Sequence, residues 1–506
     1  MAAARRRCLL LLGLLFLLLA SVAQAQIYRR TIVVTNPTSN FFGAMPIDAP
    51  IYPGMLTGVD PNGANMWFLA SDMQTLLPHF VERWDEGIGG GFKSIVWVRI
   101  PPLPANSSMT CYLMYGSPSM GSSNFEATFP TRYILESGMV TLGGVQQYYD
   151  WFEVKPGATV IVQAGSPVMI RAARARIGGT INGLGQGHPG PGGFYMSGAG
   201  PGGGAASPFR GSGGGGYGGA GGSGGSQDMT ISAGGLAYGT ENGGDFDLGS
   251  SGGSADVFGG AGGGAVQIMA RRVDVSGTID VRGGDGGVSG SFPQGFGGGG
   301  GSGGSILLSA SRVFLGPASL RADGGRGGEL VGGGGGGGRV KMHVADWFWY
   351  DEFNPPSLTV AGGESGFPVT INPPQPGSPG AYFIGNYSAV GLTNPWVSVT
   401  VGPEEATVSV ETKGLRAFVG QPMPNPSSRE VSFRIDTVRE GACRIEILDL
   451  QGRRVRSLVD GVTSAGRRDV SWDLRDENGL AVPGGLYFAN VEVEGARSTR
   501  RIVVTR

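Results

Sequence analysis

The sequence predicts an all-β protein of three parts: an N-terminal antiparallel sandwich, a Gly-rich repeated β-stack of solenoid type, and a C-terminal β-sandwich. Three observations predict this fold class. Short alternating apolar runs separated by Pro and Gly recur in the first part, as in antiparallel sheets. The middle part combines most of the 97 Gly with an internal repeat of strand-like segments. The last part carries strand-like runs with clean apolar–polar alternation.

The overall composition excludes several classes of protein. Gly follows no strict three-residue period with abundant Pro, which excludes collagen, and 40% hydrophobic residues is too high for a wholly disordered chain. A formal net charge of −1 provides no field that recruits nucleic acid or an anionic membrane. Beyond residue 20, no apolar run reaches the roughly 18 residues of a membrane-spanning helix. We therefore expect no nucleic-acid partner and no transmembrane segment.

Residues 1–25 have the features of a secretory signal peptide. Three arginines, Arg5 to Arg7, precede the apolar run Leu9 to Ala20, and Ala23-Gln24-Ala25 supplies small residues for cleavage. The two remaining cysteines, Cys111 and Cys443, fall in different predicted domains, so a disulfide framework is excluded. We expect a secreted protein or one at the bacterial cell surface, associated with the outer membrane.

Residues 27–150 contain short strand-like runs at 32–34, 66–69, 95–98 and 112–115. Five blocks occur in order: YRRTIVVTN (28–36), LLPHFVERW (76–84), SIVWVRIPPLP (94–104), CYLMYGSP (111–118) and NFEATF (124–129). They resemble a bacterial domain of unknown function with a lectin-like fold. The resemblance implies a concanavalin-like jelly-roll and no established activity.

Residues 151–365 form the Gly-rich repeat region. VMIRAARARIGGTING (168–183), VQIMARRVDVSGTIDVRGG (266–284) and ILLSASRVFLGPASLRADGG (306–325) align, and RVKMHV (339–344) with LTVAGG (358–363) is a degenerate fourth copy. Each unit is a long strand, a second strand and a Gly tract. Because such strands cannot bury an apolar face alone, the copies are expected to stack. The tracts either stay mobile or pack closely as extended backbone, and the second arrangement resembles the glycine-rich region of some receptor ectodomains.

The predicted third part follows a linker. Residues 366–412 begin with NPPQPGSPG (372–380) and include two strand-like runs, 397–401 and 406–410, that suggest a hairpin. Residues 413–506 alternate as a compact sandwich does. Four blocks carry a resemblance: QPMPNPSSREVSFRI (421–435), RIEILDLQGRRVRSLVDG (444–461), AGRRDVSWDLRDENGLAVPGGLYFANVEV (465–493) and TRRIVV (499–504). They resemble the Ig-like domain of flagellar hook-capping proteins and the C-terminal sorting domain of type IX secretion cargo, which implies a role in export or anchoring.

Chemical motifs are weak in this chain. Gly185-x-Gly187-x-x-Gly190 spells a dinucleotide fingerprint, but Pro189 and the absence of a following helix remove its context. Asp280, Asp285 and Asp323 are favoured as turn residues over calcium ligands. The three His are far apart in sequence, and Glu82 with Asp85 is too close in sequence to indicate a glycosidase pair. We expect no catalytic residue, no cofactor and no metal.

The aromatic run Trp347-Phe348-Trp349-Tyr350 follows the last long repeat. A hydrophobic cap over the end of the stack is the favoured interpretation. Trp347, Trp349 and Tyr350 are also the candidate glycan contacts, because sugars stack on aromatic rings.

These observations together predict a non-catalytic structural or adhesive protein, not an enzyme. The N-terminal domain would contact glycan or extracellular matrix, the stack would be a stalk, and the C-terminal domain would engage the secretion machinery. The alternative is a secreted carbohydrate-active enzyme with an unrecognised site.

Overall fold

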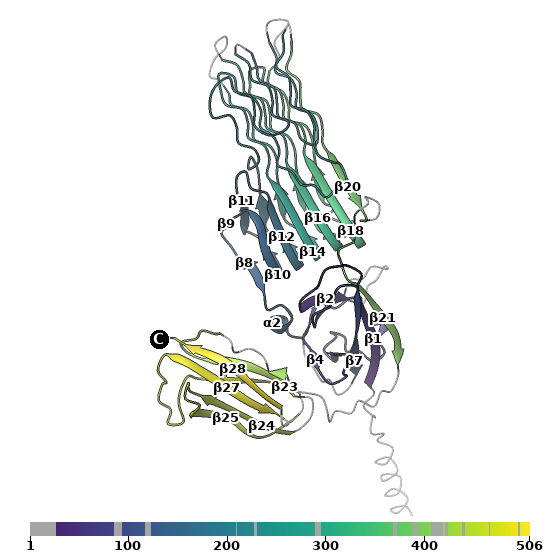
Figure 1. Ribbon diagram of the computed structural model, residues 1–506, viewed down its shortest axis with the longest axis vertical. Coiled ribbons are helices and arrows are strands. Elements are labelled where there is room, and N and C mark those ends of the chain that lie inside the picture. The colour runs from purple at the N-terminus through teal and green to yellow at the C-terminus, as the bar shows by residue number, and fades with distance from the viewer. Residues whose placement is uncertain are drawn as a thin grey trace, which may run out of the picture. The chain divides into compact units, whose positions relative to one another are not determined.

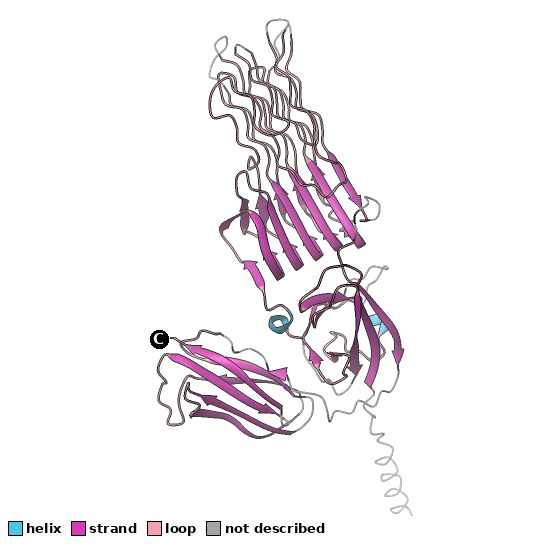
Figure 2. Cartoon of the chain, in the orientation of Figure 1, coloured by secondary structure: helices cyan, strands magenta, loops and turns pink. Residues whose placement is uncertain are grey.

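The computed structural model describes residues 27–85, 94–116, 123–208, 210–226, 230–288, 295–367, 372–387, 392, 394–405, 418–419, 422, 424–437, 441–464, 466–493 and 496–505. The predicted signal peptide lies outside these residues. The chain divides into two compact units, one of Met1–Thr128 with Val397–Arg506 and one of Phe129–Trp396. The helical segments among the described residues are short, α2 (Phe125–Thr128) and the 3-10 turn η1 (Pro53–Met55), and strands make up the rest of the regular structure (Figure 2). The predicted all-β class is confirmed.

The N-terminal domain is an antiparallel sandwich. One sheet has the order β21 (Ser398–Glu405), β1 (Ile27–Asn36), β7 (Ser107–Gly116), β3 (Met66–Leu69) and β4 (Leu76–Leu77). The other has the order β2 (Met45–Ala49), β6 (Ile95–Ile100) and β5 (His79–Arg83). Alternate residues of both sheets form one buried core, as sandwich packing requires. The lectin-like jelly-roll assignment stays a prediction.

Strand β21 corrects the predicted linker of residues 366–412. It pairs antiparallel with β1, Arg29 forms an ion pair with Glu405, and Val397 is buried in the N-terminal core. The N-terminal domain is therefore discontinuous in sequence. The second strand-like run of the predicted hairpin, 406–410, lies outside the described residues.

The predicted boundary at residue 150 is also corrected, because the stack begins earlier. Strands β8 (Arg132–Leu135), β9 (Met139–Leu142) and β10 (Gly144–Val154) pair with the strands of the repeats. The stack is thus inserted in sequence between α2 and β21. The sequence repeat could not reveal these first coils because they lack a Gly tract.

The stack consists of two parallel sheets, each built from one strand per repeat (Figure 1). The larger sheet has the order β20 (Ala381–Gly385), β18 (Arg339–Tyr350), β16 (Ser305–Leu315), β14 (Ala265–Val275), β12 (Val168–Ile177), β10 and β8. The smaller has the order β19 (Ser357–Thr359), β17 (Ser319–Arg321), β15 (Thr278–Asp280), β13 (Thr180–Asn182), β11 (Thr159–Val162) and β9. Every described pairing in both sheets is parallel, which is the geometry of a β-solenoid.

The register of the stack matches the alignment of the repeats. Ile268 lies beside Leu308, Val275 beside Leu315, and Ile279 beside Leu320. These side chains are fully buried in one core that both sheets share. A single repeat would expose this apolar face, so stacking supplies the burial that holds each coil in place.

The Gly tracts were predicted either to stay mobile or to pack closely as extended backbone. Where the structure describes them, they pack closely as extended backbone. In Figure 1 they run on from the strands of the stack as long segments that lie side by side. Their hydrogen bonds repeat every three residues. The N–H groups of Gly299 and Ser302 donate to carbonyl oxygens of the segment 250–253. Those of Gly300 and Gly303 donate to carbonyl oxygens of 333–336, and those of Gly301 and Gly304 to carbonyl oxygens of 281–284.

Successive N–H groups of a tract donate in turn to three neighbouring segments, and this three-residue period identifies the conformation of the tracts. A chain in the polyproline II conformation has three residues per turn and no internal hydrogen bonds, so its N–H groups point outward in three directions. Only Gly permits the close approach of neighbouring chains. A Cβ on Gly300, Gly301 or Gly303 would lie closer than 3.0 Å to backbone carbonyl oxygens of an adjacent segment. We call this part of the stack the glycine bundle.

The C-terminal domain is a second antiparallel sandwich. Its sheets are β22 (Phe418–Val419), β23 (Val431–Thr437) and β26 (Gly466–Trp472), and then β25 (Arg454–Thr463), β24 (Gly441–Leu448), β27 (Gly485–Val493) and β28 (Ala496–Val504). Trp472 is fully buried in a core confined to this domain, and its ring packs edge-on against Tyr487 at 5.3 Å between centroids. Cys443 here and Cys111 in the N-terminal domain are buried and unpaired as disulfides. Among the described residues, no helix has the length and hydropathy needed to cross a membrane.

Candidate functional site

The predicted aromatic contacts lie on β18, beyond the part that pairs with β20. That pairing covers Arg339–His343, so the segment 347–350 is bordered by β16 alone among the described strands. The ring of Trp349 stacks on Phe314 of β16 at 4.9 Å and 28°. Tyr350 is 42% exposed and is placed on the opposite face by the alternation of the strand. The side chain of Trp347 lies outside what the structure describes.

The aromatic run on β18 is thus distributed over two faces of the sheet. Phe348 packs against the core of the stack, which is what a hydrophobic cap requires. Trp349 covers a neighbouring ring rather than standing alone. Glycan contact by Trp347, Trp349 and Tyr350 stays a prediction.

The other motifs of the sequence have structural partners. Glu82 accepts a hydrogen bond from the indole of Trp97 at 2.7 Å, and Asp85 pairs with Arg83 at 3.2 Å. Asp280 pairs with Arg282, while Asp285 and Asp323 accept backbone N–H groups from other coils. Within the described ranges, no three or more His, Cys, Asp or Glu side chains gather in a way that could hold a metal ion. Asp285 and Asp323 therefore join neighbouring repeats of the stack.

An exposed aromatic patch lies on the glycine bundle and was missed by the sequence analysis. It consists of Phe194, Tyr195, Met196 and Phe258, which are 57%, 47%, 51% and 51% exposed. The rings of Phe194 and Phe258 stack at 5.4 Å with only 2° between their planes. A signal was present, since Phe194-Tyr195-Met196 interrupts a Gly tract where no strand is expected.

The backbone under the aromatic patch is held in a strained conformation. Tyr195 has φ of 58°, which is rare for a bulky residue. Its hydroxyl donates to Asp256 Oδ1 at 2.5 Å, and the N–H of Met196 donates to Ser254 Oγ at 2.8 Å. The hydrogen bond to Asp256 raises the pKa of Tyr195. Strain that is maintained by such contacts is a mark of functional surfaces.

A buried polar cluster joins the segment 238–247 to β18. Arg339, Lys341 and His343 alternate along β18 and therefore share one face. Arg339 Nη2 donates to the carbonyl of Tyr238 at 2.9 Å, and His343 Nε2 lies 2.9 Å from the carbonyl oxygen of Asn242. The Nζ of Lys341 contacts the carbonyl oxygens of Thr240 and Asp245 and the Asp245 carboxylate.

The ionisation of this cluster follows from burial. Burial lowers the pKa of Lys341, whose side chain is fully inaccessible. Burial alone would raise the pKa of Asp245, but hydrogen bonds from Thr240 and the pairing with Lys341 hold it below its ordinary value. The neighbouring Asp247 has a raised pKa because of burial and of the Asp245 charge. The two carboxyls therefore differ in their tendency to hold a proton.

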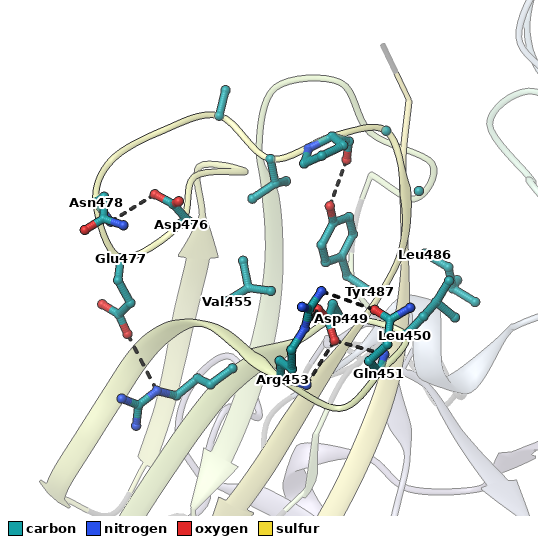
Figure 3. A pocket seen from close by; sticks show the side chains of 16 residues that line it. Asp449, Leu450, Gln451, Arg453, Val455, Asp476, Glu477, Asn478, Leu486 and Tyr487 are labelled. Carbon is teal, nitrogen blue, oxygen red and sulfur yellow. Dashed lines mark hydrogen bonds and ion pairs between the residues drawn. The ribbon is translucent and has the colours of Figure 1, made fainter.

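The C-terminal domain carries an open hollow of about 570 Å³ between its turns (Figure 3). Arg453 Nε pairs with Asp449 Oδ2 at 2.7 Å, and Arg454 Nε lies 3.9 Å from Glu477 Oε1. The hydroxyl of Tyr487 donates to the carbonyl of Pro483 at 2.9 Å. The remaining acid, Asp476, accepts the backbone N–H of Asn478 at 2.9 Å, and we assign no chemistry to this hollow (Figure 3).

Two family models match parts of the chain. A domain of unknown function, DUF2341, matches residues 62–133, and the FlgD Ig-like domain matches residues 427–497. The chain therefore carries an N-terminal DUF2341 domain and a C-terminal FlgD Ig-like domain. No curated protein matches the chain.

Three solved structures share short stretches with the chain. PorZ, an essential bacterial surface component of the type IX secretion system of Porphyromonas gingivalis, is 23% identical over 18% of this chain and 11% of its own, with a TM-score of 0.14. Dimeric latent PorU from Porphyromonas gingivalis is 20% identical over 22% and 11%, with a TM-score of 0.17. The alkylpurine DNA glycosylase AlkC of Pseudomonas fluorescens is 17% identical over 19% and 32%, with a TM-score of 0.14. The chain spans about a tenth of the length of the two Porphyromonas proteins, and these likenesses carry no functional inference.

Proposed function

We propose that this protein is an exported, non-catalytic surface protein whose glycine bundle presents an adhesive face. The observation that carries the proposal is the aromatic patch, where three aromatic rings are about half exposed on a scaffold of hydrogen-bonded backbone. Exposed rings grouped in one place are uncommon on soluble proteins and mark interaction surfaces. Because the backbone beneath them is held by hydrogen bonds, binding would cost little ordering of the loops.

A neutral glycan is the ligand that fits this patch best. The C–H face of a sugar ring packs on an aromatic face, and the rings of Phe194 and Phe258 are exposed and stacked on one another. The N-terminal domain and the aromatic run on β18 are further candidates for glycan contact. Extracellular matrix would be a partner through glycans that expose the C–H faces of neutral sugar rings.

Glycan binding is tested with residues 27–506 on an array of neutral and charged glycans. We expect retention of neutral glycans and a loss of about tenfold in affinity for Phe258→Ser, the amount that one lost ring contact costs. Phe353→Ser is the matched control, because Phe353 is 95% exposed and lies outside the patch. Equal binding by wild type and Phe258→Ser on every retained glycan would remove the patch from the proposal.

The C-terminal domain is proposed to direct export or attachment. Its FlgD Ig-like match and its self-contained core support a module that folds independently of the stack. Its partner would be the secretion machinery, as the resemblance to sorting domains implies.

Cell fractionation tests this role of the C-terminal domain. Residues 1–506 and residues 1–417 are produced in a host that has a type IX system. We expect the longer chain at the cell surface or in the medium, and the shorter chain retained inside the envelope. Equal surface display of both would leave this domain a purely structural role.

A further inference from the structure

The polar cluster on β18 contains a contact that the proposed function does not use. Lys341 Nζ lies 3.1 Å from the Oδ1 atom of Asp245, and the lysine side chain is fully buried. The two residues come from segments 96 positions apart, one in the glycine bundle and one in the larger sheet. A buried amine held against a carboxyl is the reactant pair of an amide bond.

We propose that Lys341 and Asp245 become joined by an amide bond between Nζ and Cγ, formed within the folded chain. The bond would tie the segment 238–247 covalently to β18. No cofactor or external reagent takes part, because the reaction is a condensation that releases one water.

The chemistry balances as follows. The starting pair is an ammonium and a carboxylate, and one proton moves from Nζ to the Asp245 carboxyl, which leaves a neutral amine and a carboxylic acid. Nζ attacks Cγ and forms the C–N bond. A second proton leaves Nζ for the departing oxygen, the C–O bond breaks, and water is released.

Asp247 is placed to move these protons. The charge of the neighbouring Asp245 carboxyl contributes, after burial, to the raised pKa of Asp247. A Cβ on Gly239 would lie 3.0 Å from Asp245 Oδ2, 3.1 Å from Asp247 Oδ2 and 3.1 Å from Tyr217 Cε2, so both carboxyls converge on one point beside the Tyr217 ring. Gly239 has φ of +72°, a conformation that favours Gly and turns the chain there. Burial raises the pKa of Asp247, which increases the share of its protonated form beside the reacting carboxyl.

The surroundings hold the pair together and restrict water. The Nζ is also held by the carbonyl of Thr240 at 3.3 Å, and the Asp245 carboxyl is held by the N–H of Thr240 at 3.0 Å. The ring centroids of Tyr217 and Tyr238 lie 4.9 Å apart beside the cluster, and Tyr217 is fully buried. Fixed reactants at contact distance in a partly desolvated site gain the rate advantage of an intramolecular reaction. The lowered pKa of Lys341 increases the share of the neutral amine.

A second lysine pair in the same unit serves as an internal comparison. Lys155 Nζ lies 2.6 Å from Glu136 Oε2, closer than in the proposed pair, but both side chains are well exposed. There the ions are stabilised by water. We expect no linkage between Lys155 and Glu136.

The proposal is tested by intact-mass measurement of residues 27–506 after purification in the folded state. We expect a mass lower by one water than the sequence mass, and a branched tryptic peptide that contains both Lys341 and Asp245. Folded wild-type protein at its full sequence mass, with the Lys341 amine open to acetylation after unfolding, would overturn the proposal.

Two variants separate the linkage from other losses of water. Lys341→Met should restore the full mass for its own sequence, whereas a water loss that persists in this variant arises elsewhere, for example at Asp285-Gly286, and contradicts the proposal. Asp247→Asn keeps both reacting residues and should leave most of the chain unlinked. Complete linkage in Asp247→Asn would refute the role of Asp247. Since the mass of wild type decides the main question, the test holds even if a variant fails to fold.

Discussion

Replacing Gly335 by Ala is expected to unfold the glycine bundle locally and to cost more than about 3 kcal/mol, above the usual range for overpacking. The new Cβ would lie closer than 3.0 Å to the carbonyl oxygen of Gly301, and that atom belongs to backbone. A backbone neighbour cannot rotate away as a side chain can. The N–H of Gly335 also donates to Gly325 at 2.9 Å, so a shift of the segment breaks lateral hydrogen bonds.

Gly192→Ala is the matched control for Gly335→Ala. A Cβ on Gly192 would have nothing within 4 Å, and its φ is not in the left-handed region. There Ala should be neutral or stabilise by about 0.4–1 kcal/mol through the unfolded state. Thermal melting and amide hydrogen exchange of both variants measure the difference. Equal behaviour of the two variants would contradict the close-packed bundle.

Leu308→Asp is expected to unfold the stack. Leu308 lies in register with Ile268 on one side and Met342 on the other, and its side chain has no exposed surface. A carboxylate there has no partner among the apolar residues of the core and costs roughly 3–5 kcal/mol. For a unit of this size, that lowers the midpoint of thermal unfolding by roughly 6–20 °C.

Two controls isolate the effect of charge burial at Leu308. Leu308→Met keeps the apolar volume and should cost less than about 1.5 kcal/mol. Val288→Asp introduces the same charge at a position that is 58% exposed and should leave the melting midpoint unchanged. A melting curve of Leu308→Asp that coincides with wild type would refute the stacked arrangement of the repeats.

The coils of the stack could be predicted because their determinants are local. Ile268, Val275, Leu308 and Leu315 recur at matching positions of repeated segments, and alternation along a strand sets the face of each side chain. Stacking then follows from the need to bury that face. The same local logic predicted the C-terminal sandwich, whose core contains Trp472, Val491 and other alternating residues.

The pairing of strand β21 could not be predicted from local pattern. The run 397–401 is strand-like in sequence, but it follows a Pro-rich segment and is predicted as a hairpin within a linker, whereas Ser398–Glu405 pairs with β1. Its partner β1 lies more than 360 residues earlier in the chain. Only the folded chain shows that an unpaired edge of the N-terminal sheet is closed by a strand that follows the whole stack.

The candidate sites were also decided by tertiary structure. The aromatic patch depends on Phe194 and Phe258 being brought together by tracts whose sequence is almost all Gly, and the cluster of Lys341 and Asp245 joins segments 96 residues apart. By itself, the sequence determined the all-β class, the repeated coils and the positions of the apolar faces, because strand periodicity and burial act over a few neighbouring residues. The tertiary structure alone decided how the Gly tracts pack and which distant side chains meet. A Gly tract has no side-chain pattern to read, and its backbone hydrogen bonds find their partners only when the neighbouring coils are in place.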